Sequence, residues 1–150
     1  MSQVNVEKVS ELNTRNTDNF LSYFKKLLRF FKGRIEADDY IKVMNQWDTI
    51  NRVVGQSTIV EFVGYYFLLF KDKIEEEDAE FMLNFDYTKL INRRSLSKSK
   101  QQLITSVIGS VKKVYKDGSE DEKDEIVTLV KNLAESANIH KMLKNKLENL

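Results

Sequence analysis

The most restrictive feature of this sequence is the absence of proline from all 150 residues. Proline ends helices because its ring removes a backbone donor and clashes with the preceding turn, so a chain without it can form long helices. The main breaks must then come from the five glycines. Gly33, Gly55 and Gly118 each follow a segment with helical periodicity, and we predict that each closes a helix in the left-handed conformation.

Apolar residues repeat every three or four positions, which is the spacing of one helix face rather than of a strand. Residues 1–16 are expected to be flexible or to form a short helix, and residues 84–97 to turn and link the chain. A break is expected near Asn138. The sequence therefore predicts an all-α fold, a compact single-domain bundle of about six helices over residues 1–150. The expected helices cover residues 18–32, 39–54, 58–73, 76–83, 99–116 and 119–150.

The helix expected over residues 58–73 is the most apolar of the six. Its apolar residues between positions 62 and 70 point to every side of the helix, which is typical of a helix inside a core. We predict that it is the central, buried helix. Two pairs have the spacing of a capping box at a helix start, a Ser or Thr followed three residues later by Glu: Thr58 with Glu61, and Ser119 with Glu122.

The composition is typical of a folded domain in a reducing compartment. Hydrophobic residues make up 41% and charged residues 31% of the chain, which is enough for a packed core and a solvated surface. There is no cysteine, so disulfides and thiolate ligands are excluded. The most apolar run, residues 59–70, is interrupted by Glu61 and is well short of the roughly 20 residues needed to cross a bilayer. We expect an intracellular protein without a transmembrane span.

Residues that could support catalysis are scarce. His140 is the single histidine, and we expect it on the surface of the last helix; without a second histidine or a cysteine, the common zinc sites cannot form. The glycines are isolated, so a phosphate-binding loop is absent. The acidic runs 75–80 and 117–122 lack a calcium-loop pattern and are typical of helix starts. We predict a protein that is not an enzyme and has no catalytic, cofactor-binding or metal-binding residues.

The helix expected over residues 18–32 separates its aromatic and basic residues onto opposite sides. Phe20, Phe24 and Phe31 lie on one side, and Lys25 and Arg29 lie on the other. This pattern occurs in helices that lie on membrane surfaces or bind calmodulin. It is equally typical of a helix that packs its aromatic side into a core, and we favour this interpretation because the other helices need a partner.

The basic segment, residues 89–116, carries eight Lys or Arg residues and no acidic residue. The neighbouring residues 71–86 and 117–125 each have a net charge of −5. Clustered cations can bind phosphates and give salt-dependent nucleic-acid binding. The acidic neighbours could instead pair with the basic segment, within one chain or between two chains, and we favour this reading. The candidate interaction residues are Lys89, Arg93, Arg94, Lys98, Lys100, Lys112, Lys113 and Lys116.

Residues 71–87 read KDKIEEEDAEFMLNFDY, and residues 95–104 follow with the Ser/Lys-rich helix start SLSKSKQQLI. Together they resemble a group of small helical proteins encoded by nucleocytoplasmic large DNA viruses, with Met82 at a position where a second aromatic residue is common. The resemblance implies a viral origin and a location in the host cytoplasm or the virion. It also implies three residues that anchor the fold and two that cap helices, namely Phe81, Leu83 and Tyr87, and Asp78 and Asp86.

A complete core pattern, separated charge blocks and missing catalytic residues favour binding over catalysis. We expect a non-enzymatic protein-interaction or assembly component, such as a small virion-associated or minor structural protein of a large DNA virus. Its expected partners are other proteins or copies of itself, contacted through the basic segment and the last helix. Two alternatives remain: a nucleic-acid-binding accessory protein that uses the basic segment, and peripheral membrane association through the helix over residues 18–32.

Overall fold

A computed structural model describes residues 3–93 and 95–149, apart from the side chains at positions 4 and 93, and these residues form an all-helical chain. The predicted fold class is confirmed, but the described residues form eight helices rather than about six. The helix expected over 58–73 is divided at Phe70, and part of the expected link forms a helix of its own. The helices are α1 (Gln3–Phe30), α2 (Ala37–Val53), α3 (Gln56–Leu69), α4 (Lys71–Glu75), α5 (Ala79–Asn84), α6 (Tyr87–Arg93), α7 (Lys98–Asp117) and α8 (Glu120–Glu148).

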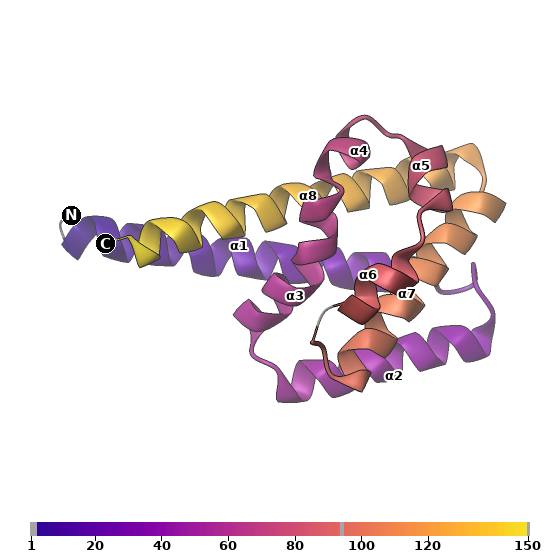
Figure 1. The fold of residues 1–150 in the computed structure, drawn as a ribbon, viewed down its shortest axis with the longest axis horizontal. Helices are drawn as coiled ribbons and strands as arrows, with labels where there is room; N and C mark the ends of the chain where they lie inside the picture. Colours follow the sequence, from indigo (N-terminus) through magenta and orange to yellow (C-terminus); the bar gives the residue numbers. More distant parts are fainter. Residues whose placement is uncertain (1–2, 94, 150) are drawn as a thin grey trace.

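The two longest helices, α1 and α8, lie side by side in opposite directions, with both chain ends at the same end of the pair (Figure 1). The predicted helix start near residue 18 is wrong, because residues 3–16 belong to α1. The predicted break near Asn138 is also wrong, because α8 continues through it. Each helix supports the other: the Asn16 side-chain amide donates a hydrogen bond of 2.9 Å to the Ser136 carbonyl. Such tertiary packing stabilises helix that local sequence preference alone would leave marginal.

The remaining helices pack against this pair. α3 crosses it, α2 lies beside α7, and the short helices α4 to α6 lead from α3 to α7 (Figure 1). The aromatic side of α1 forms the centre of the core, with Phe20, Phe24 and Phe31 fully buried. Phe24 meets Trp47 of α2 edge to face, with 5.2 Å between the ring centroids. The aromatic side of this helix therefore packs into the core, as the favoured interpretation predicted, and is not available to a membrane surface.

The apolar helix α3 is only partly buried. Ile59, Val60 and Phe62 are buried, but Leu69 near its end is 49% exposed. The prediction that every side of this helix is buried is therefore wrong for its last turn, where Leu69 faces solvent. None of the helices in the described ranges is long and apolar enough to span a bilayer.

The three glycines expected to close helices behave differently from one another. Gly33 has a φ of +77°, so its predicted left-handed conformation is confirmed. Gly55 instead precedes α3 as its N-cap, with a φ of −63°. Gly118 follows α7 with a φ of −78°, and its requirement for glycine is spatial: an added Cβ would lie 2.5 Å from the Val114 carbonyl oxygen. The left-handed prediction is therefore wrong at Gly55 and Gly118.

One of the two predicted capping boxes is present. Ser119 and Glu122 satisfy each other's backbone N–H at the start of α8, with distances of 3.2 and 3.1 Å. The pair formed by Thr58 and Glu61 does not cap α3, because α3 begins earlier, at Gln56, and Glu61 turns to α8 instead.

The residues that the viral resemblance implies as caps and anchors differ in whether the structure gives them these roles. Asp78 caps α5 by accepting the Phe81 N–H at 3.1 Å, and Asp86 accepts the Thr88 N–H at 3.1 Å at the start of α6. Tyr87 is buried, whereas Phe81 is 37% exposed and is not a buried anchor.

Candidate functional site

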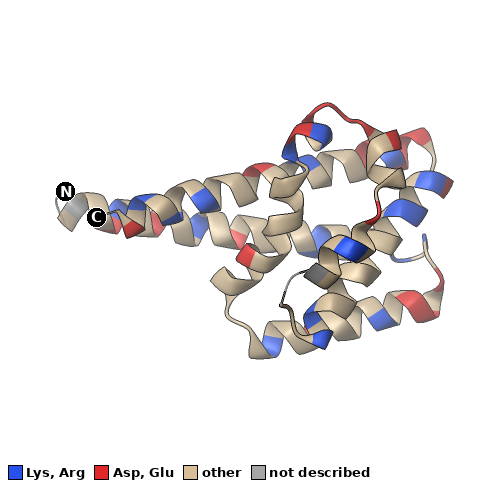
Figure 2. Cartoon of the chain, viewed as in Figure 1, with Lys and Arg blue, Asp and Glu red and all other residues tan. Residues whose placement is uncertain are grey.

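Five of the six described lysines of the basic segment are divided between the two ends of α7 (Figure 2). Lys98 and Lys100 lie in its first turn, whereas Lys112, Lys113 and Lys116 lie in its last turns. A helix rises 1.5 Å per residue, so Lys98 and Lys112 are about 21 Å apart along the helix axis. Lys89 lies on α6, while Arg94 and the side chain of Arg93 fall outside the described residues.

Several of these lysines already contact other residues of the chain. Lys113 forms an ion pair of 3.5 Å with Asp117, and the Lys100 ammonium lies 5.0 Å from the centre of the Phe62 ring. A lysine that sits over an aromatic ring keeps its charge but is held in place by that ring. These contacts reduce the number of lysines that are free to move onto a phosphate.

The acidic runs on either side of the basic segment pair mainly with other cations. Glu77 lies 3.4 Å from Lys131 of α8, and Glu122 lies 2.5 Å from Arg34. Among the described residues, the contact of Lys113 with Asp117 is the ion pair that joins the basic segment to an acidic run. Ion pairs within one chain therefore neutralise little of the positive charge of the basic segment.

A second surface of interest is the arm, which we define as residues 3–13 of α1 and 139–148 of α8. These helix ends project together from the bundle (Figure 1), and Glu61 of α3 contacts the base of the arm at His140 and Lys144. Leu12, Ile139 and Met142 on the arm are 41%, 37% and 59% exposed. Ile139 and Met142 are three residues apart, so they share one side of α8. The arm thus carries apolar side chains that the chain itself does not cover.

His140 lies where the arm joins the bundle, and its predicted surface position is wrong because it is only 3% exposed. Its Nε2 lies 3.8 Å from a Glu61 oxygen on α3, and the Lys144 ammonium donates to that oxygen at 2.6 Å. Neither ring nitrogen makes a hydrogen bond. Burial lowers the pKa of His140, and the Glu61 carboxylate opposes this only in part. Its spacing from the buried Leu133 and Ala137 of α8 was the sequence signal for an inward position.

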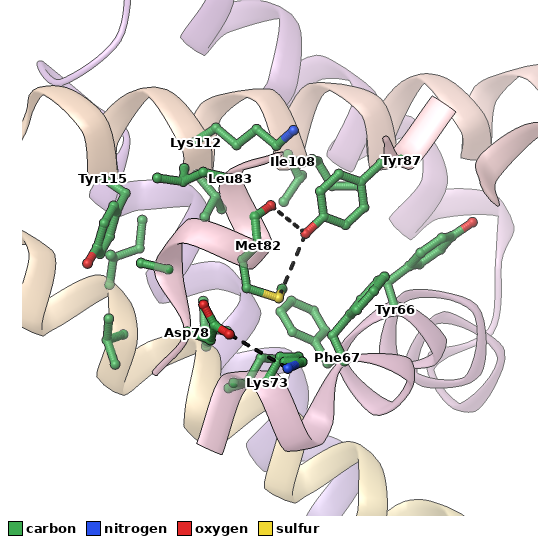
Figure 3. Close-up of a pocket in the computed structure, with 18 of the residues that line it drawn as sticks. Tyr66, Phe67, Lys73, Asp78, Met82, Leu83, Tyr87, Ile108, Lys112 and Tyr115 are labelled. Carbon is green, nitrogen blue, oxygen red and sulfur yellow. Dashed lines mark hydrogen bonds and ion pairs between the residues drawn. The ribbon is translucent and has the colours of Figure 1, made fainter. Parts of the chain in front are cut away.

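The third feature is an apolar cavity of about 160 Å³ that is partly open to solvent; it is lined mainly by α3, α4, α5, α7 and α8, with Phe24 of α1 and Tyr87 of α6 (Figure 3). Aromatic and aliphatic side chains make up nearly all of its wall. Four charged residues also line it: Lys73, Glu77, Asp78 and Lys112. The wall includes Phe67 and Phe70, then Ile104, Ile108 and Val111 of α7, and Val127 and Val130 of α8.

The short helix α5 (Ala79–Asn84) covers this cavity without being part of the core. None of its residues is buried, although Met82 and Leu83 line the cavity (Figure 3). The helix is held near both ends. Asp78, its N-cap, lies 3.6 Å from the Lys73 ammonium, and the Tyr87 hydroxyl donates to the Met82 carbonyl at 2.9 Å. We call α5 the lid.

Tyr87 and Lys112 form hydrogen bonds that hold the lid and the residue after it in place. Lys112 donates to the Phe85 carbonyl at 3.3 Å and lies 4.7 Å from the centre of the Tyr87 ring. The rings of Phe70, Phe85 and Tyr87 pack edge to face, with centroids 4.8–5.4 Å apart. Burial raises the pKa of Tyr87 to about 12, so its hydroxyl remains a donor at neutral pH. Lys112 of the basic segment is therefore engaged in the support of the lid.

Sequence reasoning did not single out the residues around the cavity. Ile104, Ile108 and Val111 form part of an ordinary helix stripe, and such a stripe is expected for any helix that faces a core. The stripe indicates which side faces inward but not whether the opposing side chains fill the space.

Within the residues that the structure describes, no group of three or more His, Cys, Asp or Glu side chains is arranged to hold a metal ion. Comparison with protein families, with curated proteins and with solved structures found no match to this chain.

Proposed function

We propose that this chain is a non-enzymatic assembly protein that associates with a second copy of itself through the arm. The observation that carries the proposal is the exposure of Leu12, Ile139 and Met142 on a two-helix projection. They are three of the seven large apolar side chains that are exposed in the described residues. Exposed apolar side chains that gather on one element favour an interaction surface over a freely solvated one.

Two helices packed only against each other cannot enclose an apolar core, because each covers only one side of the other. In the arm, Val6 and Val9 of α1 and Leu143 and Leu147 of α8 are only half-buried. A second arm would supply two further helices and complete a four-helix arrangement, in which these side chains face one another.

The charges of the arm favour another arm as the partner. Lys141 and Lys146 are exposed on α8 and form no ion pair within the described residues, while Glu7 and Glu11 are exposed on α1, where Glu11 also pairs with Arg15 at 3.2 Å. In a two-fold dimer the same surface of each copy meets the other, so α1 of one copy can lie beside α8 of its partner. This arrangement brings the two glutamates of one copy near the two lysines of the other.

Sedimentation velocity over a range of protein concentrations tests the proposal. The wild-type chain is expected to form a dimer, and the double substitution Ile139→Glu with Met142→Glu is expected to raise the dimer dissociation constant at least tenfold. Val53→Glu is a matched control, because Val53 is 76% exposed on α2, away from the arm. Far-UV circular dichroism checks that each variant keeps its helices.

Two results would overturn this assignment. A wild-type chain that stays monomeric at every concentration would remove the basis for self-association. A dimer that forms equally well in the arm variant and in the Val53→Glu control would place the contact elsewhere on the molecule.

The resemblance of residues 71–87 and 95–104 to small helical proteins of nucleocytoplasmic large DNA viruses supports a narrower form of the proposal. In that form the assembly is part of a virion, and the chain is a minor structural component. Detection of the chain in purified virus particles at a fixed ratio to the major capsid protein is the corresponding test.

Nucleic-acid binding by the basic segment has less support. Lys100, Lys112 and Lys113 contact other residues of the chain, and five of the six described lysines are divided between the ends of α7. A salt titration with duplex DNA and with RNA separates the two functions. Affinity that falls steeply with salt, and falls further in Lys98→Glu with Lys116→Glu, would favour nucleic-acid binding over self-association.

A further inference from the structure

We propose that the cavity beneath the lid is a binding site for a small neutral apolar molecule, of the size of one aromatic ring with a short alkyl group. The site is separate from the arm: the parts of α1 and α8 that line it are Phe24 and residues 126–130, whereas the arm consists of residues 3–13 and 139–148. Ligand binding in the cavity can therefore be tested independently of self-association through the arm.

The size of the cavity suits a small apolar ligand. Protein interiors are packed as closely as organic crystals, and voids much larger than a water molecule are few. An enclosed apolar cavity of about 150 Å³, engineered in another protein, binds benzene. The cavity of this chain, at about 160 Å³, falls in the same range. Because its side chains lack neighbours across the void, an apolar occupant gains the missing dispersion contacts.

The charges at the edge of the cavity indicate that the ligand is neutral. Lys73 and Asp78 lie 3.6 Å apart and neutralise each other, and Glu77 pairs with Lys131 at 3.4 Å. The Lys112 ammonium donates to the Phe85 carbonyl and lies over the Tyr87 ring, and the Tyr87 hydroxyl donates to the Met82 carbonyl. An ionised head group could pair with one of these groups only by breaking its present contacts, and an unpaired buried charge is strongly disfavoured.

The lid provides a route into the cavity. It is a helix of six residues with no buried residue, so it can open at a lower free-energy cost than the long helices behind it. Its displacement breaks the contacts of Asp78 with Lys73 and of Tyr87 with Met82 but leaves the core of α1, α7 and α8 in place. Met82 has a flexible, unbranched side chain that can adapt to ligands of different outline.

Titration with ethylbenzene, followed by methyl NMR and by thermal unfolding, tests the site. Saturable shifts are expected at the methyl groups of Ile104, Ile108 and Val111, but not at Ile139 or Met142 of the arm. At tenfold excess over its Kd, the ligand is expected to raise the melting temperature by about 4 °C. Phenylacetate, which has a similar outline and a negative charge, is expected to produce neither effect.

Substitutions that fill the cavity supply the decisive comparison. Val111→Phe is expected to abolish the ethylbenzene shifts, whereas Val53→Phe, at an exposed position of α2, is expected to leave them unchanged. Ile108→Phe serves the same purpose if Val111→Phe does not fold.

Three results would overturn the inference. The first is the absence of saturable shifts in the wild-type chain. The second is equal binding of phenylacetate and ethylbenzene, which would contradict the neutral ligand. The third is an unchanged ethylbenzene response in a folded cavity-filling variant, which would place the ligand outside the cavity.

Discussion

At the scale of single residues, two glycines near each other in the sequence are present for different reasons. Gly118 joins α7 to α8, and a Cβ there would lie 2.5 Å from the Val114 carbonyl oxygen and 3.2 Å from the Glu122 Cβ. Gly109 lies inside α7, and a Cβ there would meet nothing within 4 Å. Neither glycine has a positive φ. The close approach of the chain around Gly118, rather than its backbone conformation, therefore requires glycine.

The two glycines should respond in opposite directions to alanine. Gly118→Ala must push backbone atoms apart, and we expect it to reduce the free energy of unfolding by about 1–3 kcal/mol. Gly109→Ala adds a methyl group in open space within a helix and should raise the free energy of unfolding by roughly 0.5–1 kcal/mol. Urea unfolding of both variants checks this. Equal stability of Gly118→Ala and the wild type would show that the turn can relax around the added carbon.

At the scale of elements, a pair of buried polar residues joins the two longest helices. Asn16 of α1 donates to the Ser136 carbonyl of α8 at 2.9 Å, and the Ser136 hydroxyl donates back to the Asn16 side-chain oxygen at 3.0 Å. Both residues are less than 9% exposed. Because buried polar groups need partners, these hydrogen bonds favour one register of α1 along α8 over a slide by one turn.

Asn16→Ala should reduce the free energy of unfolding by about 1–3 kcal/mol, since it removes two buried hydrogen bonds between the Asn16 side chain and Ser136. The combined variant Asn16→Ala with Ser136→Ala should cost less than the sum of the two single changes, because the residues act on each other. Asn138→Ala, at a partly exposed position of α8, is the control. Additive effects in urea unfolding would mean that the two side chains do not act as a pair.

Helices whose signal lies within their own sequence could be predicted, whereas helices stabilised by distant residues could not. The helices expected over 39–54 and 99–116 match α2 and α7 closely, because each has an apolar stripe within its own sequence. The first half of α1 was missed because the contact that accompanies it, with Ser136, lies 120 positions away. α6 was missed because seven residues are too few for a periodic pattern to stand out.

The candidate sites show the same limit more strongly. The basic segment is evident from composition, and the helix expected over 99–116 already separates its lysines into two groups, but only the fold reveals which of them contact other residues of the chain. The cavity could not be predicted, because its walls come from helices that are distant in the sequence and its volume depends on how their side chains meet. His140 could have been placed inside from its spacing to Leu133 and Ala137, but its polar side chain favoured the surface.

At the scale of the whole molecule, the single histidine makes the free energy of unfolding depend on pH. His140 is 3% exposed and faces Glu61 of α3 and Lys144 of its own helix. Burial lowers its pKa below the ordinary value near 6.5. As the pH falls through 6.5, the unfolded chain therefore binds a proton at this position before the folded chain does. Stability must decrease over this range, because the unfolded state binds more protons.

We expect the free energy of unfolding of the wild-type chain to fall by at most about 1.4 kcal/mol between pH 7.5 and 5.5, the linkage limit for one group with an unfolded pKa near 6.5. His140→Leu replaces the imidazole with an apolar side chain and so removes the titrating group. This variant should not show the loss of stability that protonation of His140 causes. Urea unfolding at a fixed, low protein concentration measures the difference without interference from self-association. The α-amino group titrates in both proteins, so it does not affect the comparison. Parallel losses of stability in the two proteins would show that protonation of His140 is not disfavoured by folding.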